Sequence, residues 1–239
     1  TKDQSDIYLL QELKTIEDGF PKEIIKNAGY YSYVNGQKAW NGVAILSKEK
    51  LEITNTSIPK YDDPNARFIE TEIQLKKIKK NIKLINIYLP NGNPIETEKF
   101  DYKIKWMKKF NSYIQELKDK NIPIIISGDF NVIPSDDDVY SPENFKNDAC
   151  AHPLTREQYR ILINMGFTDL VKHFVEGKTN WTFWGYRGGG WQKGNGLRID
   201  HFLTTANVTD LVKNVTVNRE PRGWDKASDH TPVTITLEN

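Results

Sequence analysis

Short apolar runs fill the first ninety residues of the chain and predict β-strands. They cover residues 6–12, 43–46, 51–58, 68–75 and 82–89. Turn-forming sequences such as Asn35-Gly36 separate them. We therefore expect a meander of antiparallel strands in this part of the protein.

After residue 99 the hydrophobic period lengthens to that of a helix. The apolar positions are Phe100, Ile104, Met107, Ile114 and Leu117, and the surrounding lysines are Lys99, Lys103, Lys105, Lys108 and Lys109. This spacing predicts an amphipathic surface helix whose lysines face water.

Strand and helix signals alternate again from residue 122. A strand at 122–127 precedes an acidic, proline-punctuated loop at 134–153, which we expect on the surface. Thr155 is the expected N-cap of a second helix, Gln158 completes its capping box and Gly166 lies near its end.

Residues 179–196 stand apart because aromatic side chains alternate there with Arg187 and three consecutive glycines. Such aromatics could form ordinary core strands, but the glycines and the arginine favour a loop that wraps a ligand. Strand patterns return at 197–205 and 233–237. The order of elements, without an internal repeat, favours one α/β domain over residues 1–239, built from two packed sheets with helices outside.

The composition narrows the class of protein further. The chain has 33 Lys and Arg residues and 32 Asp and Glu residues, so nucleic-acid binding would depend on local basic patches. A single cysteine, Cys150, excludes an internal disulfide framework and a cysteine zinc cluster. No apolar stretch reaches the roughly 20 residues that a membrane helix needs. We expect a cytoplasmic monomer without membrane contact.

The start of the chain is unusual. Thr1 is followed almost at once by the strand pattern of residues 6–12, as though the chain were entered partway through a fold. We expect an upstream segment.

Two polar groups near the middle of the chain could bind a metal or a water molecule. Asp129 and Asn131 follow the strand at 122–127, and on an extended segment their side chains leave the same face. A tight turn before Pro134 explains the same residues without chemistry. Glu12, at the end of the first strand, offers a carboxylate that Mg²⁺ accepts, although a lone glutamate there is usually only solvated.

A second set of candidates lies near the C-terminus. Asp229 and His230 are adjacent and should serve different partners, the carboxylate a metal and the imidazole a phosphate. Asp200 is placed to orient a histidine as in a catalytic dyad, and a salt bridge to Arg198 or Arg67 is the alternative.

Tyr88 ends the strand at 82–89, where its hydroxyl could donate to a developing phosphoryl charge. A buried tyrosine is otherwise commonplace in a protein core.

These residues together resemble the exonuclease III family of DNA repair nucleases, within the broader group that includes pancreatic-type DNases, inositol phosphatases and sphingomyelinases. The resemblance spans nearly the whole chain, and its order of motifs is specific although each motif alone is weak. The matching pieces are Leu10-Gln11-Glu12, residues 41–47, Ala66-Arg67-Phe68, residues 86–92, Gly128-Asp129-Phe130-Asn131, residues 182–187, residues 196–200 and Ser228-Asp229-His230.

The resemblance implies a four-layered α/β sandwich with two mainly antiparallel sheets, and a Mg²⁺-dependent nuclease, with Mn²⁺ as a possible substitute. Its expected reactions on double-stranded DNA are cleavage 5′ to an abasic site and removal of nucleotides or blocking groups from 3′ ends.

The family motifs also imply roles for individual residues. Glu12 looks like the principal metal carboxylate, Asp129 the residue that activates the attacking water and Asn131 the group that positions it. His230, oriented by Asp200, would contact the scissile phosphate.

Further roles follow from the same motifs. Tyr88 would stabilise the transition state, and Asp229 would lie close to the metal. We also expect Asp129, Asn131 and His230 at the metal site. Positions that line a pocket for the extrahelical abasic sugar match Phe183, Trp184 and Ile199. Positions that contact the DNA backbone match Asn91, Arg67 and Arg187.

One departure concerns the start of the chain, since family members begin with a strand whose Asn helps hold the metal. That strand would lie ahead of Thr1. Two other functions stay open at this stage: a phosphatase or phosphodiesterase of the same fold acting on inositol phosphates or phospholipids, and a catalytically silent DNA-binding fragment.

Overall fold

A six-stranded sheet forms the centre of the computed structural model, which describes residues 5–75, 81–177 and 180–238. Its order is β4-β5-β6-β7-β9-β8, and only β6 and β7 among these neighbours run parallel. The strands are β4 (Ile53–Asn55), β5 (Phe68–Ile73), β6 (Ile82–Tyr88), β7 (Ile124–Asp129), β8 (Phe167–Asp169) and β9 (Asp200–Thr205). The meander expected early in the chain is therefore confirmed for β4, β5 and β6.

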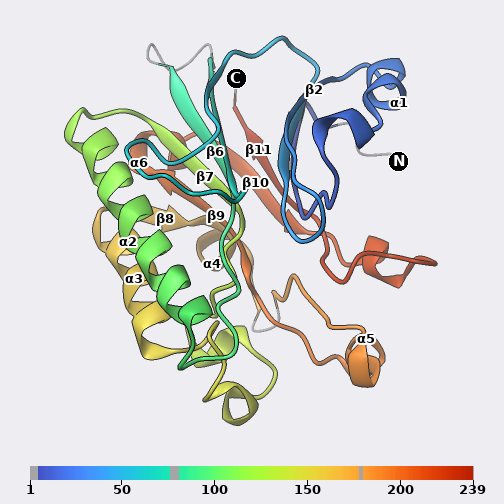
Figure 1. The fold of residues 1–239 in the computed structure, drawn as a ribbon, viewed down its shortest axis with the longest axis vertical. Coiled ribbons are helices and arrows are strands. Elements are labelled where there is room, and N and C mark those ends of the chain that lie inside the picture. The colour runs from blue at the N-terminus through green and yellow to red at the C-terminus, as the bar shows by residue number, and fades with distance from the viewer. Residues whose placement is uncertain (1–4, 76–80, 178–179, 239) are drawn as a thin grey trace.

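Two smaller sheets pack on one face of this central sheet. One has the order β1-β3-β2, from β1 (Ile7–Gln11), β2 (Tyr31–Asn35) and β3 (Val43–Ser47), and the other pairs β10 (Val212–Val217) with β11 (Val233–Leu237). Leu9 of β1 and Leu237 of β11 pack in one cluster with Leu84 and Ile125 of the central sheet. The blue and red strands lie together on this side in Figure 1.

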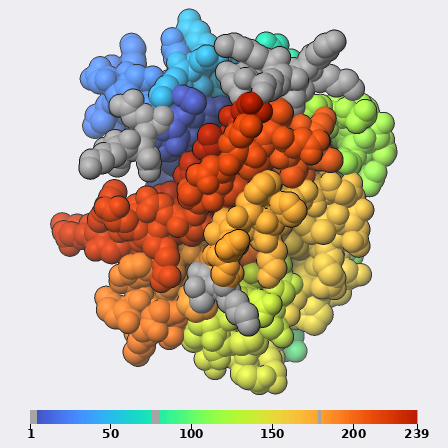
Figure 2. Space-filling model, turned by 180° about the vertical axis from the view of Figure 1, so that it is seen from behind, coloured from blue at the N-terminus to red at the C-terminus, as the bar shows by residue number. Residues whose placement is uncertain are grey.

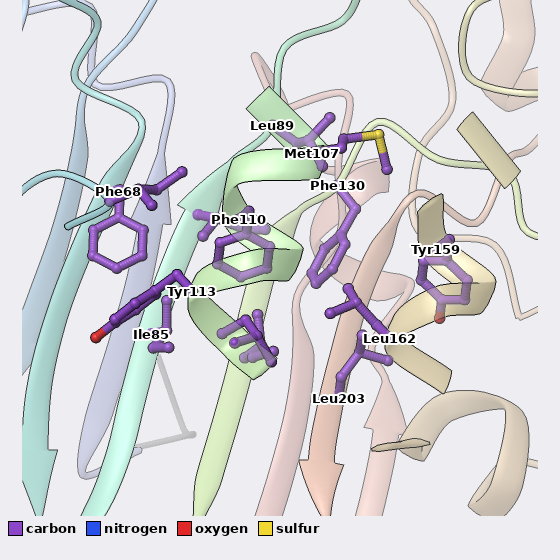
Figure 3. Close-up of a cluster of buried hydrophobic side chains, with 14 of the residues drawn as sticks. Phe68, Ile85, Leu89, Met107, Phe110, Tyr113, Phe130, Tyr159, Leu162 and Leu203 are labelled. Atoms are coloured by element: carbon purple, nitrogen blue, oxygen red, sulfur yellow. The ribbon is translucent and has the colours of Figure 1, made fainter. Parts of the chain in front are cut away.

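Two helices, α2 (Glu98–Asp119) and α3 (Pro153–Asn164), cover the other face. The alternation of side chains along the strands explains the layering, because Ile85 and Ile126 point toward the helices, whereas Leu84 and Ile125 point toward the small sheets. Figure 3 shows Phe110 and Tyr113 of α2 packed among Phe68, Ile85 and Phe130, with Leu162 of α3 beside Leu203. The predicted α/β architecture of packed sheets with outer helices is confirmed.

The remaining helices are short. They are α1 (Lys22–Asn27), α4 (Leu170–Phe174), α5 (Gly190–Lys193) and α6 (Ala206–Thr209), with 3₁₀ turns η1 (Glu17–Gly19), η2 (Asp136–Asp138), η3 (Pro142–Phe145), η4 (Arg187–Gly189) and η5 (Glu220–Gly223). Seen from behind, the segment around η5 projects from the body at the level of the orange residues 185–195 (Figure 2). No helix in the described ranges is long and apolar enough to cross a bilayer.

Two local predictions about the helices were wrong. His152, not Thr155, caps α3, because its Nδ1 accepts a hydrogen bond from the backbone of Leu154 at 3.2 Å. Thr155 and Gln158 are buried inside the helix, where the Gln158 side chain accepts a hydrogen bond from Asn111 of α2. Lys103 does not face water, since none of its surface is exposed.

Candidate active site

Adjacent strands of the central sheet bring three of the predicted residues into one row. Tyr88, at the end of β6, pairs in register with Asp129, at the end of β7, and Asp129 pairs with Asp200, at the start of β9. The parallel β6–β7 pair places two carboxyl ends together, and the antiparallel β9 begins at the same edge. The topology thus explains why residues far apart in sequence meet here.

Glu12 reaches this row from the small sheet, in the residue directly after β1. Its Oε1 accepts a hydrogen bond from the Tyr88 hydroxyl at 2.8 Å, and its Oε2 lies 2.9 Å from Lys14 Nζ. Burial opposes ionisation of Glu12, but the Lys14 and Tyr88 hydrogen bonds outweigh it and lower the carboxyl pKa. Burial, with the charges of Asp129 and Glu12, raises the pKa of Tyr88 far above its usual value, so its hydroxyl stays a donor.

His230 forms the predicted dyad with Asp200. Its Nδ1 lies 2.9 and 3.0 Å from the two Asp200 carboxylate oxygens, and its Nε2 lies 3.9 Å from Asp129 Oδ2. Burial lowers the imidazole pKa, but the Asp200 carboxylate more than compensates and raises it to about 10. The ring is therefore protonated at neutral pH. The alternative salt bridge of Asp200 to Arg198 is not formed, since Arg198 binds Asp138 and Asp169 instead.

Asp129 and Asn131 form both the tight turn and the polar pair that the sequence allowed. Asp129 Oδ1 accepts from the Asn131 backbone at 2.8 Å and Oδ2 accepts from the Asn131 amide at 3.1 Å. Asn131 adopts a left-handed φ of 48°, and Glu12 a φ of 52°, a conformation that is uncommon outside glycine and concentrates at functional sites. Burial raises the pKa of Asp129 to about 7.

Glu12, Asp129 and His230 each offer an atom within 4.8 Å of the others, and no further group of three or more such residues occurs in the described chain. The two carboxylates suit a hard divalent cation such as Mg²⁺, whereas Asn131 turns its Nδ2 toward Asp129 and its Oδ1 toward Asn91. The protonated His230 ring fits a phosphate better than a cation. Asp229, predicted near the metal, is outside the group; its backbone carbonyl accepts from Trp184 at 2.8 Å.

The predicted DNA-backbone contacts differ in exposure. Asn91 and Arg187 are exposed, and Asn91 Nδ2 donates to Asn131 Oδ1 at 3.1 Å. Arg67 is half-buried, with its guanidinium 4.9 Å from the centre of the Tyr88 ring and Nη1 donating to the Tyr88 carbonyl at 3.1 Å. Asn91 and Arg67 therefore border the row of catalytic candidates.

Of the predicted sugar-pocket residues, Phe183 lies beside His230. The Phe183 ring packs edge-on against the His230 imidazole, with ring centres 4.9 Å apart. Ile199 is buried in a cluster with Leu197. Trp184 has no exposed surface, so in this structure it could act on a ligand only through its neighbours.

Sequence reasoning missed three residues that support the site. Thr182 Oγ1 accepts a hydrogen bond from the backbone N–H of Asp200 at 3.1 Å, and Lys14 pairs with Glu12. Lys103 donates to the backbone carbonyls of Asn91 and Asn131. A signal existed for Lys103, which follows Phe100 by three residues and precedes Met107 by four, on the buried face of the helix.

A buried ion cluster supports the start of β9, two residues before Asp200. Arg198 Nε lies 2.7 Å from Asp138 Oδ1, and Arg198 Nη1 lies 2.7 Å from Asp169 Oδ2. Burial alone would raise the pKa of both carboxyls, but Arg198 holds both values below the usual range.

Replacing Arg198 with Met should lower the free energy of unfolding by about 3–5 kcal/mol near neutral pH, because two buried carboxylates lose their cation. In the wild type these groups have a depressed folded-state pKa, so their stabilisation is present above about pH 4 and is lost as the pH falls through the folded-state pKa. In the variant their pKa rises, and protonation stabilises the native state as the pH falls. Urea unfolding should therefore show the difference shrinking from about pH 7 to about pH 4; a constant difference would contradict this account.

Comparisons with known proteins agree with the geometry. The sequence profile of the Endonuclease/Exonuclease/phosphatase family matches residues 1–230. The chain is 33% identical to exodeoxyribonuclease III of Haemophilus influenzae, over 97% of this chain and 90% of the relative. It is 28% identical to a DNA-(apurinic or apyrimidinic site) endonuclease of Dictyostelium discoideum, over 99% of this chain and 64% of that protein.

Solved structures with the same fold include two with TM-scores of 0.90 and 31% identity. One is the 3′ phosphatase NExo from Neisseria bound to a product DNA hairpin, and the other is an AP endonuclease from Archaeoglobus fulgidus. Each alignment covers 98% of this chain and 89% of the other.

Proposed function

The chain belongs to the endonuclease/exonuclease/phosphatase family, and on that basis we propose that it is a metal-dependent DNA repair nuclease. Its substrates are phosphodiesters 5′ to abasic sites and at the 3′ ends of double-stranded DNA. It uses Mg²⁺, for which Mn²⁺ can substitute, and it acts as a monomer, which accords with Glu12, Asp129 and His230 meeting within a single chain.

The convergence of Glu12, Asp129 and His230 within 4.8 Å carries the proposal. The two carboxylates can bind a cation, and the cationic imidazole beside them can bind a phosphate. Hydrolysis of a phosphodiester is assisted by both kinds of group at one place. A binding module without catalysis has no need of this arrangement. A divalent cation held by Glu12 and Asp129, with Asn131 nearby, would neutralise a non-bridging phosphate oxygen.

Asp129 is the proton acceptor for the attacking water. Burial raises the pKa of this carboxyl above its usual value, which increases its strength as a general base. Asn131 is hydrogen-bonded to both Asp129 oxygens, and it orients the carboxylate and the water.

His230 and Tyr88 supply hydrogen-bond donors to the phosphoryl oxygens. The Asp200 carboxylate fixes the imidazole through Nδ1, which leaves Nε2, 3.9 Å from Asp129 Oδ2, free to donate to a phosphoryl oxygen. Tyr88 keeps its proton, because its pKa is raised, and it donates when its hydroxyl leaves Glu12. Such donors act where negative charge develops in the transition state.

DNA recognition depends on local groups, since the chain carries a net charge of only +1. Arg67, Asn91 and Arg187 contact the phosphate backbone around the site, independently of base sequence. Phe183 and Ile199, with Trp184 behind them, form the apolar slot for the abasic sugar.

Incision of matched duplexes tests this function. With Mg²⁺, a duplex with one abasic site should be nicked 5′ to the site, an intact duplex should not, and a recessed 3′ phosphate should be removed. Chelation with EDTA should abolish both reactions. Turnover of inositol phosphates without DNA cleavage, or DNA binding without cleavage, would overturn the proposal.

A further inference from the structure

Lys103 of α2 is buried against the active-site loops, although it is a charged residue on a surface helix. Its side chain has no exposed surface, and Nζ donates hydrogen bonds to the carbonyl of Asn91 at 3.0 Å and of Asn131 at 2.6 Å. No carboxylate in the described ranges lies within ion-pair distance of Nζ. Burying an ammonium group is costly unless it makes strong hydrogen bonds.

The two carbonyls belong to loops that follow neighbouring parallel strands. Asn91 follows β6 and Asn131 follows β7, and the Asn91 amide also donates to Asn131 Oδ1 at 3.1 Å. The loops are therefore joined by side chains, since Asn131 Nδ2 also donates to the Leu89 carbonyl at 3.0 Å, and by the ammonium group of Lys103 between their backbones.

The lysine stem is closely enclosed as well. A Cβ atom at Gly92 would lie 2.6 Å from Lys103 Cδ, and Gly92 itself has a left-handed φ of 86°. The backbone at Gly92 thus approaches the stem more closely than any other residue type would permit. This enclosure limits the rotamers of the lysine and fixes its tip.

We propose that Lys103 is a positioning residue of the active site. It holds the left-handed backbone of Asn131, and so keeps the backbone N–H and the side-chain amide of Asn131 hydrogen-bonded to Asp129. The expected loss of kcat rests on the proposed function, whereas the expected change in amide hydrogen exchange does not. The Lys103 Nζ donates to the Asn131 carbonyl and fixes it. With φ at 48°, the Asn131 N–H points toward Asp129 Oδ1. The side-chain amide of Asn131 donates to Asp129 Oδ2. Loss of this support would misplace groups on which the reaction depends.

Lys103→Met tests the inference, because Met keeps a similar length and removes the donors. We expect kcat on the abasic duplex to fall by roughly 10- to 100-fold while the dissociation constant for DNA changes less than about threefold. Lys105→Met, an exposed lysine of the same helix, should match the wild type. In an Asn131→Ala background, Lys103→Met should cost less than in the wild-type background, because the side-chain amide that it positions is gone and only the backbone N–H remains to be held.

Amide hydrogen exchange without DNA gives a second readout. The amides of Asn131 and Ile133 should exchange at least about tenfold faster in Lys103→Met, whereas the Thr231 amide, which donates to the Thr182 carbonyl, should not change. If Met prevents folding, Lys103→Gln should give the same pattern.

Equal losses of kcat in the wild-type and Asn131→Ala backgrounds, or unchanged exchange at Asn131, would overturn the inference. If the wild-type protein does not nick abasic DNA, the proposed function is wrong. Amide hydrogen exchange at Asn131 then still tests the positioning role of Lys103.

Discussion

Replacing His230 with Asn will lower kcat on an abasic duplex by about 10³-fold, within the range that positioned proton donors contribute. Asn can retain a hydrogen bond to Asp200 but cannot present a positive charge to the phosphate. Single-turnover cleavage with saturating enzyme will measure the chemical step, and DNA affinity should change only a few-fold.

His173→Asn is the matched control, since His173 is exposed on α4 and has no place in the proposed site. Its activity should equal that of the wild type. A His230→Asn protein that keeps more than about a tenth of the wild-type rate would remove the imidazole from the mechanism.

Glu12→Gln should raise the Mg²⁺ concentration needed for half-maximal activity by at least tenfold, about the effect of disturbing even an indirect metal contact. The change preserves the size of the side chain and removes one negative charge from the metal group. Excess Mg²⁺ should restore part of the rate, because the other residues of the site stay in place.

Glu17→Gln serves as the comparison, because Glu17 is exposed and its carboxylate pairs with Lys22 at the start of α1. Its Mg²⁺ dependence should not shift. An unchanged Mg²⁺ requirement in Glu12→Gln would exclude Glu12 as a ligand.

Most of the candidate site could be predicted because its residues end or begin strands. Asp129 and Tyr88 lie at the ends of apolar runs that predict strands, and a sheet collects such ends at its edge. Sequence alone could not supply the register, which sets Asp129 directly between Tyr88 and Asp200. Register depends on which strands become neighbours, and that choice is made by the whole core.

The missed elements share weak local patterns. The strand β2, for example, begins with the exposed Tyr31, and β10 carries Lys213 and Asn214 in a half-exposed hairpin. Such strands are stabilised by pairing with β3 and β11 rather than by their own apolar alternation.

The errors at Thr155 and Lys103 have one cause. Both residues are polar: a capping-box pattern assigned Thr155 to a helix cap, and helical periodicity assigned Lys103 to the solvent. Tertiary structure instead gave them buried places, Thr155 within the first turn of α3 and Lys103 beneath two loops. A polar residue on the apolar face of a helix is therefore a better sign of a buried hydrogen-bonding role than of a solvated one.

The central claim is that Glu12 and Asp129 hold one divalent cation beside His230. Anomalous scattering from crystals grown with Mn²⁺ would test it most directly. We predict one strong peak for an ion coordinated by both carboxylates, on the side of the His230 ring where Nε2 faces Asp129. A peak that touches neither carboxylate, for instance in the acidic turn at Asp136–Asp138, would contradict the account.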